Sequence, residues 1–450
     1  MARLFGTDGV RGIANRELTA ELALELSIAA ARVLGETGAF RERRPVALVG
    51  RDTRISGEFL AAAVCAGLAS AGVDVVDVGV VPTPGLAYLV NTEGADLGVM
   101  LSASHNPMPD NGIKFFQRGG VKLDDFLEDQ IEERLESPWE RPTGADVGHV
   151  TADDGTLLHR YVDYLVASLG GISLAGLKIV VDGANGAAAL TAVPAFTAAG
   201  AEVIGMNITP TGLNINDKAG STHMDGLQAA VVEHGAMLGV ALDGDADRCL
   251  AVDASGNLVD GDKIMAILAV ELKAQGKLHN DTLVATIMSN LGLINAMREH
   301  EIHVEQTRVG DRYVLEAMGA DGFTLGGEQS GHVIISEYAN TGDGVLTALH
   351  LAAAMATSGK SVAELASIMT SLPQVMINVP NVDKMRAGVD PEITQAVTAA
   401  NKELGNGGRV VLRPSGTEPL VRVMVEATTD EQAREIAERL AGLVAHRLAL

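Results

Sequence analysis

Three carboxylates at alternate positions, Asp243, Asp245 and Asp247, are the clearest chemical signal in the sequence. They directly follow an apolar run that predicts a buried strand. A tight loop that presents three carboxylates can direct them to one hard cation, and oxygen ligands select magnesium or calcium. An EF-hand fits poorly, because the glycine of its sharp turn and its closing glutamate are missing from the required positions. We therefore expect residues 243–248 to form a metal-binding loop.

A serine at the end of another predicted strand is the candidate nucleophile. Ser104 directly follows the apolar run 97–101, in a loop without the Gly-x-Ser-x-Gly elbow of hydrolases. His105 is not expected to act as its base, because neighbouring side chains in an extended segment point apart. A serine that stores a phosphoryl group and hands it on needs a metal and positive charge rather than a triad, and Lys114 returns towards this loop. Taken alone, the motif also fits an ordinary loop serine.

Two further loops have residues suited to a phosphorylated ligand rich in hydroxyl groups. In the segment 326–332, Glu328 and Ser330 alternate, so they can face the same side and bind paired hydroxyl groups of a polyol. In the segment 413–422, arginines, hydroxyls and exposed amides can form a phosphate cradle. Its candidate residues are Arg413, Ser415, Gly416, Thr417 and Arg422. An ordinary glycine-rich turn and a surface salt bridge are the respective alternatives.

The composition favours a protein that acts on a small anionic molecule. The 450 residues carry a net charge of −24, which repels phosphodiester backbones and anionic lipids, so neither nucleic-acid nor membrane binding is expected. Against this charge an anionic substrate needs a local basic site, which the arginines of the segment 413–422 supply. Two cysteines without a Cys-x-x-Cys pattern, and an N-terminus without the apolar core of a signal peptide, favour a cytoplasmic location.

The predicted elements alternate between strands and helices. Thr19 and Ser56 are expected to cap two helices, and strands at 97–101, 237–242 and 323–325 each end in one of the polar loops. Ligands of parallel sheets bind at the carboxyl ends of the strands. After about residue 372 the order becomes strand, helix, two strands and a long helix, which indicates an antiparallel α+β module. The predicted domains are 1–155, 156–256 and 257–370, all α/β, and 371–450, α+β.

Taken in order, the four loops resemble the phosphoserine, metal, sugar and phosphate loops of the α-D-phosphohexomutase superfamily. The opening segment Phe5–Gly12 is also similar, and the resemblance covers essentially the whole chain. It implies four domains around a central cleft, with mixed sheets in the three α/β domains. It also implies that phosphorylated Ser104 exchanges its phosphoryl group with a sugar phosphate. In this resemblance Ser104 and the three aspartates bind Mg²⁺, Arg11, Lys114 and Arg248 add positive charge, and Lys114 and His332 are candidates for moving protons.

Several details resemble the members of the superfamily that act on glucosamine phosphates: Asp-Ala-Asp in the metal loop, Glu-Gln-Ser in the sugar loop and the segment 309–313. The implied reaction converts glucosamine 6-phosphate to glucosamine 1-phosphate, for bacterial cell-wall synthesis. A sugar 1,6-bisphosphate is its intermediate and activator. Within the superfamily, a phosphomannomutase or phosphoglucomutase is the alternative. A metal-dependent phosphohydrolase needs no sugar loop, and a non-catalytic sensor needs no nucleophile. A homodimer is compatible with the resemblance.

Overall fold

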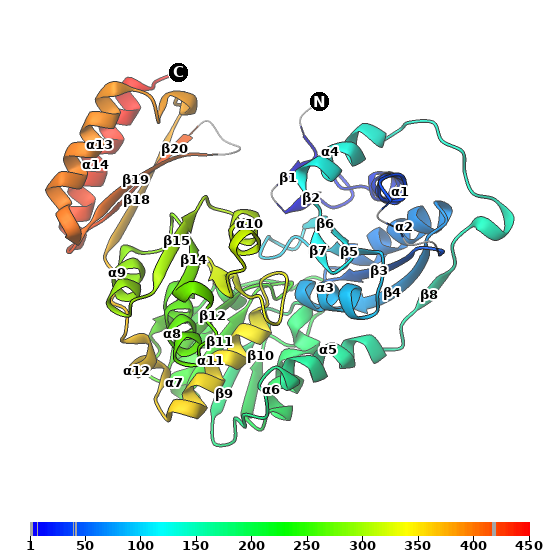
Figure 1. Ribbon diagram of the computed structural model, residues 1–450, viewed down its shortest axis with the longest axis horizontal. Coiled ribbons are helices and arrows are strands. Elements are labelled where there is room, and N and C mark those ends of the chain that lie inside the picture. The colour runs from blue at the N-terminus through cyan, green and yellow to red at the C-terminus, as the bar shows by residue number, and fades with distance from the viewer. Residues whose placement is uncertain (1–2, 7, 39, 41–42, 416–419) are drawn as a thin grey trace.

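The computed structural model describes residues 3–6, 8–38, 40, 43–415 and 420–450. Four β-sheets with their helices follow one another along the chain. In Figure 1 the blue N-terminal unit and the orange C-terminal unit lie at opposite ends of the molecule. This arrangement confirms the predicted class of three α/β units followed by an α+β unit. The domain boundaries near residues 155, 256 and 370 stay predictions.

The first unit is a mixed eight-stranded sheet with the order β1-β2-β6-β5-β3-β4-β8, and β7 pairs with β6. The strands β5, β3, β4 and β8 run parallel, whereas β6 returns antiparallel beside β5 and so brings Lys114 back towards the end of β5. The strands are β1 (Phe5–Gly6), β2 (Gly9–Ile13), β3 (Val46–Arg51), β4 (Asp74–Val80), β5 (Leu97–Leu101), β6 (Asp110–Gln117), β7 (Val121–Lys122) and β8 (Val150–Ala152). The helices are α1 (Ala20–Glu36), α2 (Ser56–Ser70), α3 (Thr83–Thr92) and α4 (Asp125–Arg134).

The second and third units are smaller mixed sheets with the orders β10-β9-β11-β12-β13 and β15-β14-β16-β17. The second contains α5 (Thr156–Ala167), β9 (Lys178–Asp182), α6 (Ala192–Ala198), β10 (Glu202–Met206), α7 (Asp225–His234), β11 (Leu238–Leu242), β12 (Cys249–Asp253) and β13 (Leu258–Val259). The third contains α8 (Gly261–Ala274), β14 (Thr282–Thr286), α9 (Leu291–Glu299), β15 (His303–Thr307), α10 (Asp311–Asp321), β16 (Leu325–Gly327), β17 (Val333–Ile335), α11 (Gly344–Ser358) and α12 (Val362–Ala366).

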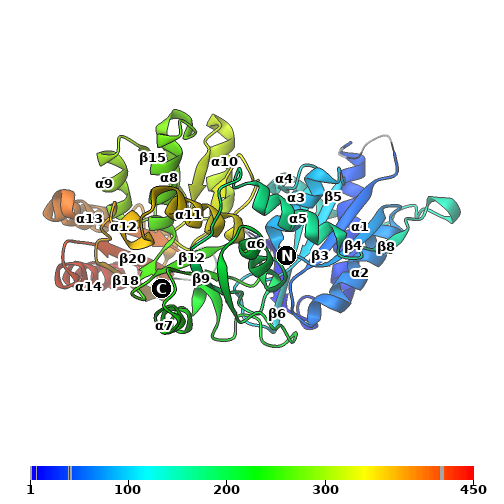
Figure 2. The same cartoon turned by 90° about the horizontal axis from the view of Figure 1, so that it is seen from below.

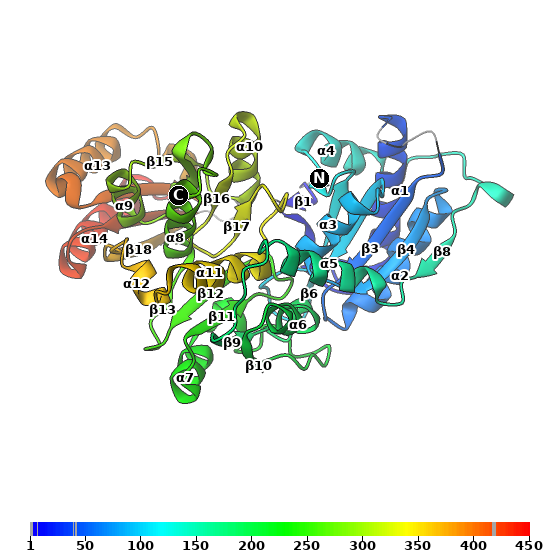
Figure 3. The ribbon, with the colours of Figure 1, turned by 60° about the horizontal axis from the view of Figure 1, so that its bottom comes forward.

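The second and third units share one hydrophobic core, whereas the first and fourth have cores of their own. The shared core is built around α11, which contacts α5, α8, β11, β12 and β17 (Figure 2, Figure 3). Eleven residues of α11 are buried, as expected of a helix that is apolar on all sides. The two middle units are therefore one block, to which the outer units are attached.

The fourth unit is an antiparallel three-stranded sheet with the order β18-β20-β19, as predicted. Its elements are β18 (Gln374–Pro380), α13 (Pro391–Leu404), β19 (Arg409–Pro414), β20 (Leu420–Glu426) and α14 (Asp430–Arg447). Both helices lie on the same face of this sheet in Figure 1. Among the described residues, the structure contains no helix with the length and hydropathy of a membrane span.

The two predicted helix caps have different outcomes. The Thr19 side chain accepts a hydrogen bond from the backbone N–H of Leu22 at 3.2 Å, so Thr19 caps α1 as predicted. The prediction for Ser56 is wrong, because Ser56 is the first residue of α2 itself. Its hydroxyl accepts a hydrogen bond from Asn111 Nδ2 at 2.9 Å instead. A contact with a distant strand therefore replaces the local cap.

Candidate active site

Ser104 and the three aspartates meet where β5 and β11 end. The Ser104 hydroxyl donates a hydrogen bond to Asp243 Oδ2 at 2.5 Å, and both side chains are buried. The strand β5 belongs to the first sheet and β11 to the second, so two units of the fold supply the two loops. The structure thus places the candidate nucleophile against the candidate metal ligands, although they are 139 residues apart in the sequence.

Two side chains that the sequence analysis did not identify hold the backbone of the serine loop. Arg54 Nη2 donates to the carbonyl oxygens of Asn106 and Ser104, at 2.6 and 3.2 Å. Asn216 Nδ2 donates to the same two oxygens, at 3.1 and 2.9 Å. These bonds hold Ser104 at a φ of +51°, a left-handed conformation that few residues other than glycine adopt. Arg54 lies shortly after the end of β3, as Ser104 lies shortly after the end of β5. A charged residue just after a predicted parallel strand is the sequence signal that could have identified Arg54.

The three aspartates form a cluster that fits a divalent cation. Each offers one carboxylate oxygen, and these three oxygens lie within 4.8 Å of one another. All three residues are buried. Burial and the negative charges of Asp247 and Asp245 raise the pKa of Asp243 well above its usual value. Among the described residues, Asp245 Oδ1 and Asp247 Oδ1 are buried without a hydrogen-bond partner. Convergent, unpartnered carboxylate oxygens are the donor set that a hard cation requires.

Lys114 is buried beside this cluster. Its Nζ lies 2.8 Å from Asp245 Oδ2 and 2.9 Å from Asp8 Oδ2. Burial by itself would lower the pKa of Lys114, but the charges of Asp245 and Asp8 raise it above its usual value. Thr83, at the start of α3, also donates to Asp245 Oδ2, at 2.6 Å. Lys114 therefore carries a fixed positive charge at the metal loop, and Asp8 and Thr83 are site residues that the sequence analysis did not identify.

The structure corrects the expectation for His105. Its side chain does not point away from Ser104, because His105 Nδ1 lies 3.2 Å from Ser104 Oγ. The premise of an extended segment is wrong: the left-handed turn at Ser104 brings the two neighbouring side chains together. Burial and the charges of Arg248 and Arg11 lower the pKa of His105 to about 4. The ring is thus neutral at neutral pH and can share a hydrogen bond with the serine hydroxyl.

A cavity of about 630 Å³ opens beside these loops, and all four units contribute to its walls. His332 is 3% exposed, and its Nε2 accepts a hydrogen bond from the N–H of Gly342 at 3.2 Å. Glu328 Oε1 accepts one from the N–H of Gly310 at 3.1 Å. Ser330 is exposed and, among the described residues, does not line the cavity. The predicted site residues that line it are Arg11, Asp247, Arg248, Glu328, His332 and Arg413.

The fourth loop places two arginines side by side on the C-terminal sheet. Arg413 and Arg422 are directly opposite each other in the antiparallel pairing of β19 and β20, and like charges in this position are destabilising. Burial and the charge of Arg422 lower the pKa of Arg413. Ser415 is buried at the end of β19. Gly416 and Thr417 lie outside the described residues. A bound anion would relieve the repulsion between the two guanidinium groups.

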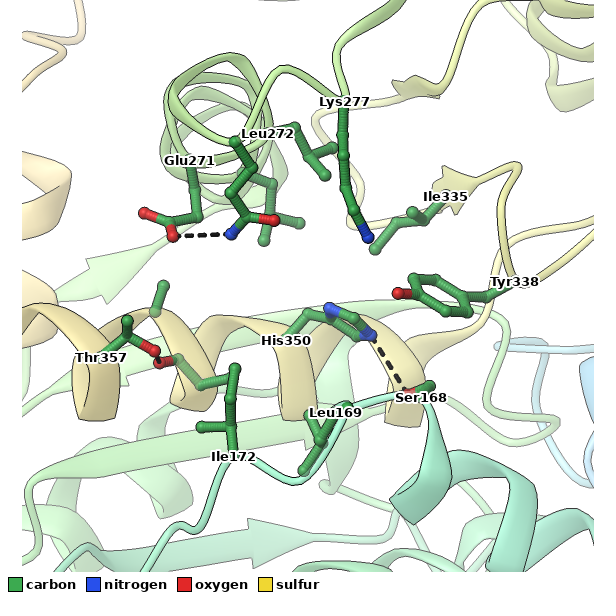
Figure 4. A pocket seen from close by; sticks show the side chains of 15 residues that line it. Ser168, Leu169, Ile172, Glu271, Leu272, Lys277, Ile335, Tyr338, His350 and Thr357 are labelled. Carbon is green, nitrogen blue, oxygen red and sulfur yellow. Dashed lines mark hydrogen bonds between the residues drawn. The ribbon is translucent and has the colours of Figure 1, made fainter.

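A second cavity, of about 310 Å³, lies between the end of α5, α8 and α11 (Figure 4). His350 Nε2 lies 3.2 Å from Ser168 Oγ there, and Lys277 forms an ion pair with Glu337 at 3.1 Å. Among the described residues, the two cavities share none of their lining. Within the described part of the chain, the second cavity is lined by none of the predicted site residues, and we call the cavity beside Ser104 the cleft.

Four sequence models of phosphoglucomutase/phosphomannomutase domains match the chain in order. The α/β/α domains I, II and III match residues 2–141, 159–256 and 260–372, and the C-terminal domain matches residues 376–443. The chain belongs to the phosphoglucomutase/phosphomannomutase family. Its four sheets correspond to the four domains of this family, and the cleft lies where these domains meet.

Bacterial relatives match the chain over its full length. A phosphoglucosamine mutase of Cutibacterium acnes is 66% identical over 100% of both chains, and one of Streptomyces griseus is 62% identical over 99% of both. A solved phosphoglucomutase/phosphomannomutase family protein from Burkholderia thailandensis has a TM-score of 0.82 and 26% identity, over 100% of this chain and 98% of its own. An N-acetylphosphoglucosamine mutase of Aspergillus fumigatus, solved with GlcNAc-6P and magnesium, shares the fold with a TM-score of 0.67 and 18% identity, over 98% of this chain and 95% of its own.

Proposed function

We propose that the protein interconverts glucosamine 6-phosphate and glucosamine 1-phosphate, and so supplies an amino-sugar precursor for bacterial cell-wall synthesis. The observation that carries this proposal is the 2.5 Å contact between Ser104 Oγ and the carboxylate of Asp243. Their neighbours in sequence, His105 and Asp247, line the cleft to which all four domains contribute. The full-length relatives named phosphoglucosamine mutase support the amino sugar as substrate. Phosphomannomutase and phosphoglucomutase activities are not favoured.

Ser104 carries the phosphoryl group in this proposal. Phosphorylated Ser104 gives its phosphoryl group to the free hydroxyl of the substrate, which forms a sugar 1,6-bisphosphate. After the intermediate turns over in the cleft, its other phosphoryl group returns to the Ser104 hydroxyl. Ser104, Asp243, Asp245 and Asp247 would hold Mg²⁺, which when bound would neutralise negative charge on the transferring group.

The basic residues around Ser104 stabilise charge and orient the substrate. Arg11 and Arg248 line the cleft, and Lys114 lies buried between Asp8 and Asp245. The two carboxylates raise the pKa of Lys114 by more than burial lowers it. Lys114 is therefore better suited to hold a positive charge than to exchange protons. His332, which lines the cleft, is then the better of the two candidates for moving a proton to or from a sugar hydroxyl.

The remaining loops bind the parts of the substrate that do not react. Glu328 and Ser330 would accept and donate hydrogen bonds at the sugar hydroxyls. The distal phosphate would be bound by the C-terminal loop, through Arg413, Ser415, Gly416, Thr417 and Arg422. Because the bisphosphate presents each phosphate in turn, this loop must bind both ends of the sugar equally well. The partners of the protein in this proposal are a small sugar phosphate, a 1,6-bisphosphate activator and a second copy of the chain, in the cytoplasm.

A coupled assay that compares glucosamine 6-phosphate, glucose 6-phosphate and mannose 6-phosphate tests the proposed function. We expect the highest kcat/KM for glucosamine 6-phosphate, with no release of inorganic phosphate. A preference for mannose or glucose phosphate would contradict the assignment of the substrate. Release of inorganic phosphate without formation of the 1-phosphate would contradict the mutase mechanism as a whole.

A further inference from the structure

Lys122, the second residue of β7, joins two carboxylates from different domains. Its Nζ lies 2.7 Å from Asp8 Oδ1 in domain I and forms an ion pair with Asp311, at the start of α10 in domain III. The Lys122 side chain is 15% exposed and that of Asp311 13%, so solvent ions screen this contact little. Neither residue belonged to the candidate site defined from the sequence.

This lysine completes a row of alternating charges that passes along the cleft. The carboxylate of Asp8 is shared, because its other oxygen lies 2.9 Å from Lys114 Nζ, which in turn contacts the metal loop. At the opposite end of the row, Asp311 Oδ2 lies 3.9 Å from His332 Nε2. The members of the row are Asp245, Lys114, Asp8, Lys122, Asp311 and His332.

His332, the last member of the row, lines the cleft. Because His332 Nε2 accepts a hydrogen bond from the N–H of Gly342, the neutral ring carries its proton on Nδ1. His332 Nδ1 is buried and has no hydrogen-bond partner among the described residues, and His332 lines the cleft. Asp311 thus lies beside a side chain that lines the cleft.

We propose that Lys122 is a positioning residue of the mutase reaction, which fixes the Asp311 carboxylate beside His332 and holds domain I against domain III. The inference rests on the proposed function of the cleft. Lys122 acts through Asp311, since among the described residues the cleft is lined by Asp311 and His332 but not by Lys122.

The protonation of Asp311 depends on this arrangement. Three charged or titratable side chains face it: Lys122 from β7, Asp8 from the turn between β1 and β2, and His332 from the loop before β17. Burial by itself would raise the pKa of Asp311, but the positive charge of Lys122 outweighs it and lowers the pKa below its usual value. Loss of the lysine charge should raise the pKa of Asp311 by about 1–3 units, because that is the usual effect of an adjacent opposite charge.

The chain offers a matched control at the same domain interface. Arg312, the next residue of α10, forms ion pairs with Asp125 and Glu128 of α4, which faces α10 in Figure 3. Its guanidinium thus joins domains I and III as Lys122 does, but it is directed at α4. Arg312→Gln removes an interdomain charge pair while the Lys122–Asp311 pair remains.

The experiment is the pH dependence of kcat/KM for the wild type, Lys122→Met, Asp311→Asn, the double variant and Arg312→Gln. We expect Lys122→Met to move the acid limb upward by about 1–3 units. Arg312→Gln should lower the thermal midpoint but should not change the pH of the acid limb of kcat/KM. On the Asp311→Asn background, Lys122→Met should shift the acid limb less than it does alone, because the shift passes through Asp311. An unmoved acid limb in Lys122→Met, or an equal shift in Arg312→Gln, would overturn the proposal.

A second measurement does not depend on activity. In Lys122→Met the buried Asp311 carboxylate has lost its positive partner, which is costly when Asp311 is ionised but not when it is protonated. The loss in thermal midpoint relative to wild type should therefore be larger at pH 8 than at pH 5. A loss that is the same at both pH values would contradict the role assigned to Lys122. If the wild type does not convert glucosamine phosphates, the proposed function is wrong. The thermal comparison then still tests the role of the Lys122–Asp311 ion pair.

Discussion

Gly244, between the first two aspartates, allows a close approach between the metal loop and the serine loop. A Cβ at this position would lie 2.5 Å from the carbonyl oxygen of Ser104 and 2.9 Å from Asn216 Nδ2. Both neighbours are fixed, because Asn216 Nδ2 donates to that same carbonyl and Arg54 donates to it as well. Gly244 has no positive φ, so the conflict is one of space alone. The variant Gly244→Ala therefore tests the distance between the loops.

The size of the effect follows from the overlap. Ordinary van der Waals contact begins at 3.4 Å, so the two loops would have to separate by roughly 0.9 Å, and a misplacement of about 1 Å at reacting groups can cost around 100-fold in rate. Steady-state kinetics at saturating glucosamine 6-phosphate should show this loss in kcat. Intact-protein mass followed over time should show that the phosphate on Ser104 is gained and lost slowly.

A matched control is available on α14. A Cβ at Gly442 would meet no atom within 4 Å, so Gly442→Ala should keep full activity and gain about 1 kcal/mol in the free energy of unfolding from its helix position. The comparison separates crowding at the site from a general effect of the added methyl group. If Gly244→Ala turned over within twofold of wild type, the close approach of the two loops would not matter for catalysis and the reasoning would be refuted.

Three further variants test the carrier, the metal ligands and the distal phosphate site. Ser104→Ala should fold normally but lose turnover, and intact mass should detect phosphate on the wild type alone; wild-type rates would contradict the carrier role. Asp245→Asn should lower kcat steeply, and chelation should silence the wild type until Mg²⁺ is added back; full activity in excess chelator would exclude a metal at this loop. Arg422→Ala should lose a charge-assisted bond of about 1.5–3 kcal/mol, which raises KM and lets the bisphosphate escape. Its progress curves should decay and recover on addition of a sugar 1,6-bisphosphate, and linear curves with an unchanged KM would argue against phosphate binding by Arg422.

The sequence predicted the parts of the fold that depend on local pattern. The buried strands β5 and β11 are continuous apolar runs, and the polar residues that directly follow them lie at the predicted positions. The antiparallel C-terminal sheet could likewise be predicted from the order of its elements. These features could be predicted because the apolar run of a buried strand and the order of the elements are properties of the local sequence.

The features that sequence reasoning missed depend on contacts between distant segments. Arg54 and Asn216 become part of the site only because β3 and the loop before α7 pack against the serine loop. His105 was judged by the rule for extended chains, which does not hold at the left-handed Ser104. The Ser56 cap failed because Ser56 is itself the first residue of α2, and its hydroxyl accepts a hydrogen bond from the distant Asn111 instead. In each case the outcome depends on a contact or a backbone turn that the local pattern does not contain.

The balance of charge around the cleft agrees with the sites that the motifs predict. Lys114, Asp8, Lys122 and Asp311 each lie beside a side chain of opposite charge. Among the described residues of the candidate site, two groups differ from this pattern, since the three aspartates exceed their cationic neighbours and Arg413 lies opposite Arg422. A buried charge without a partner is costly, and a bound ligand of opposite charge offsets that cost. The excess of negative charge lies against Ser104 and the excess of positive charge lies on the C-terminal domain. A cation beside the reacting phosphoryl group and an anion at the other end of the substrate would offset both, which is the distribution of charge that a sugar bisphosphate and its metal ion would complete.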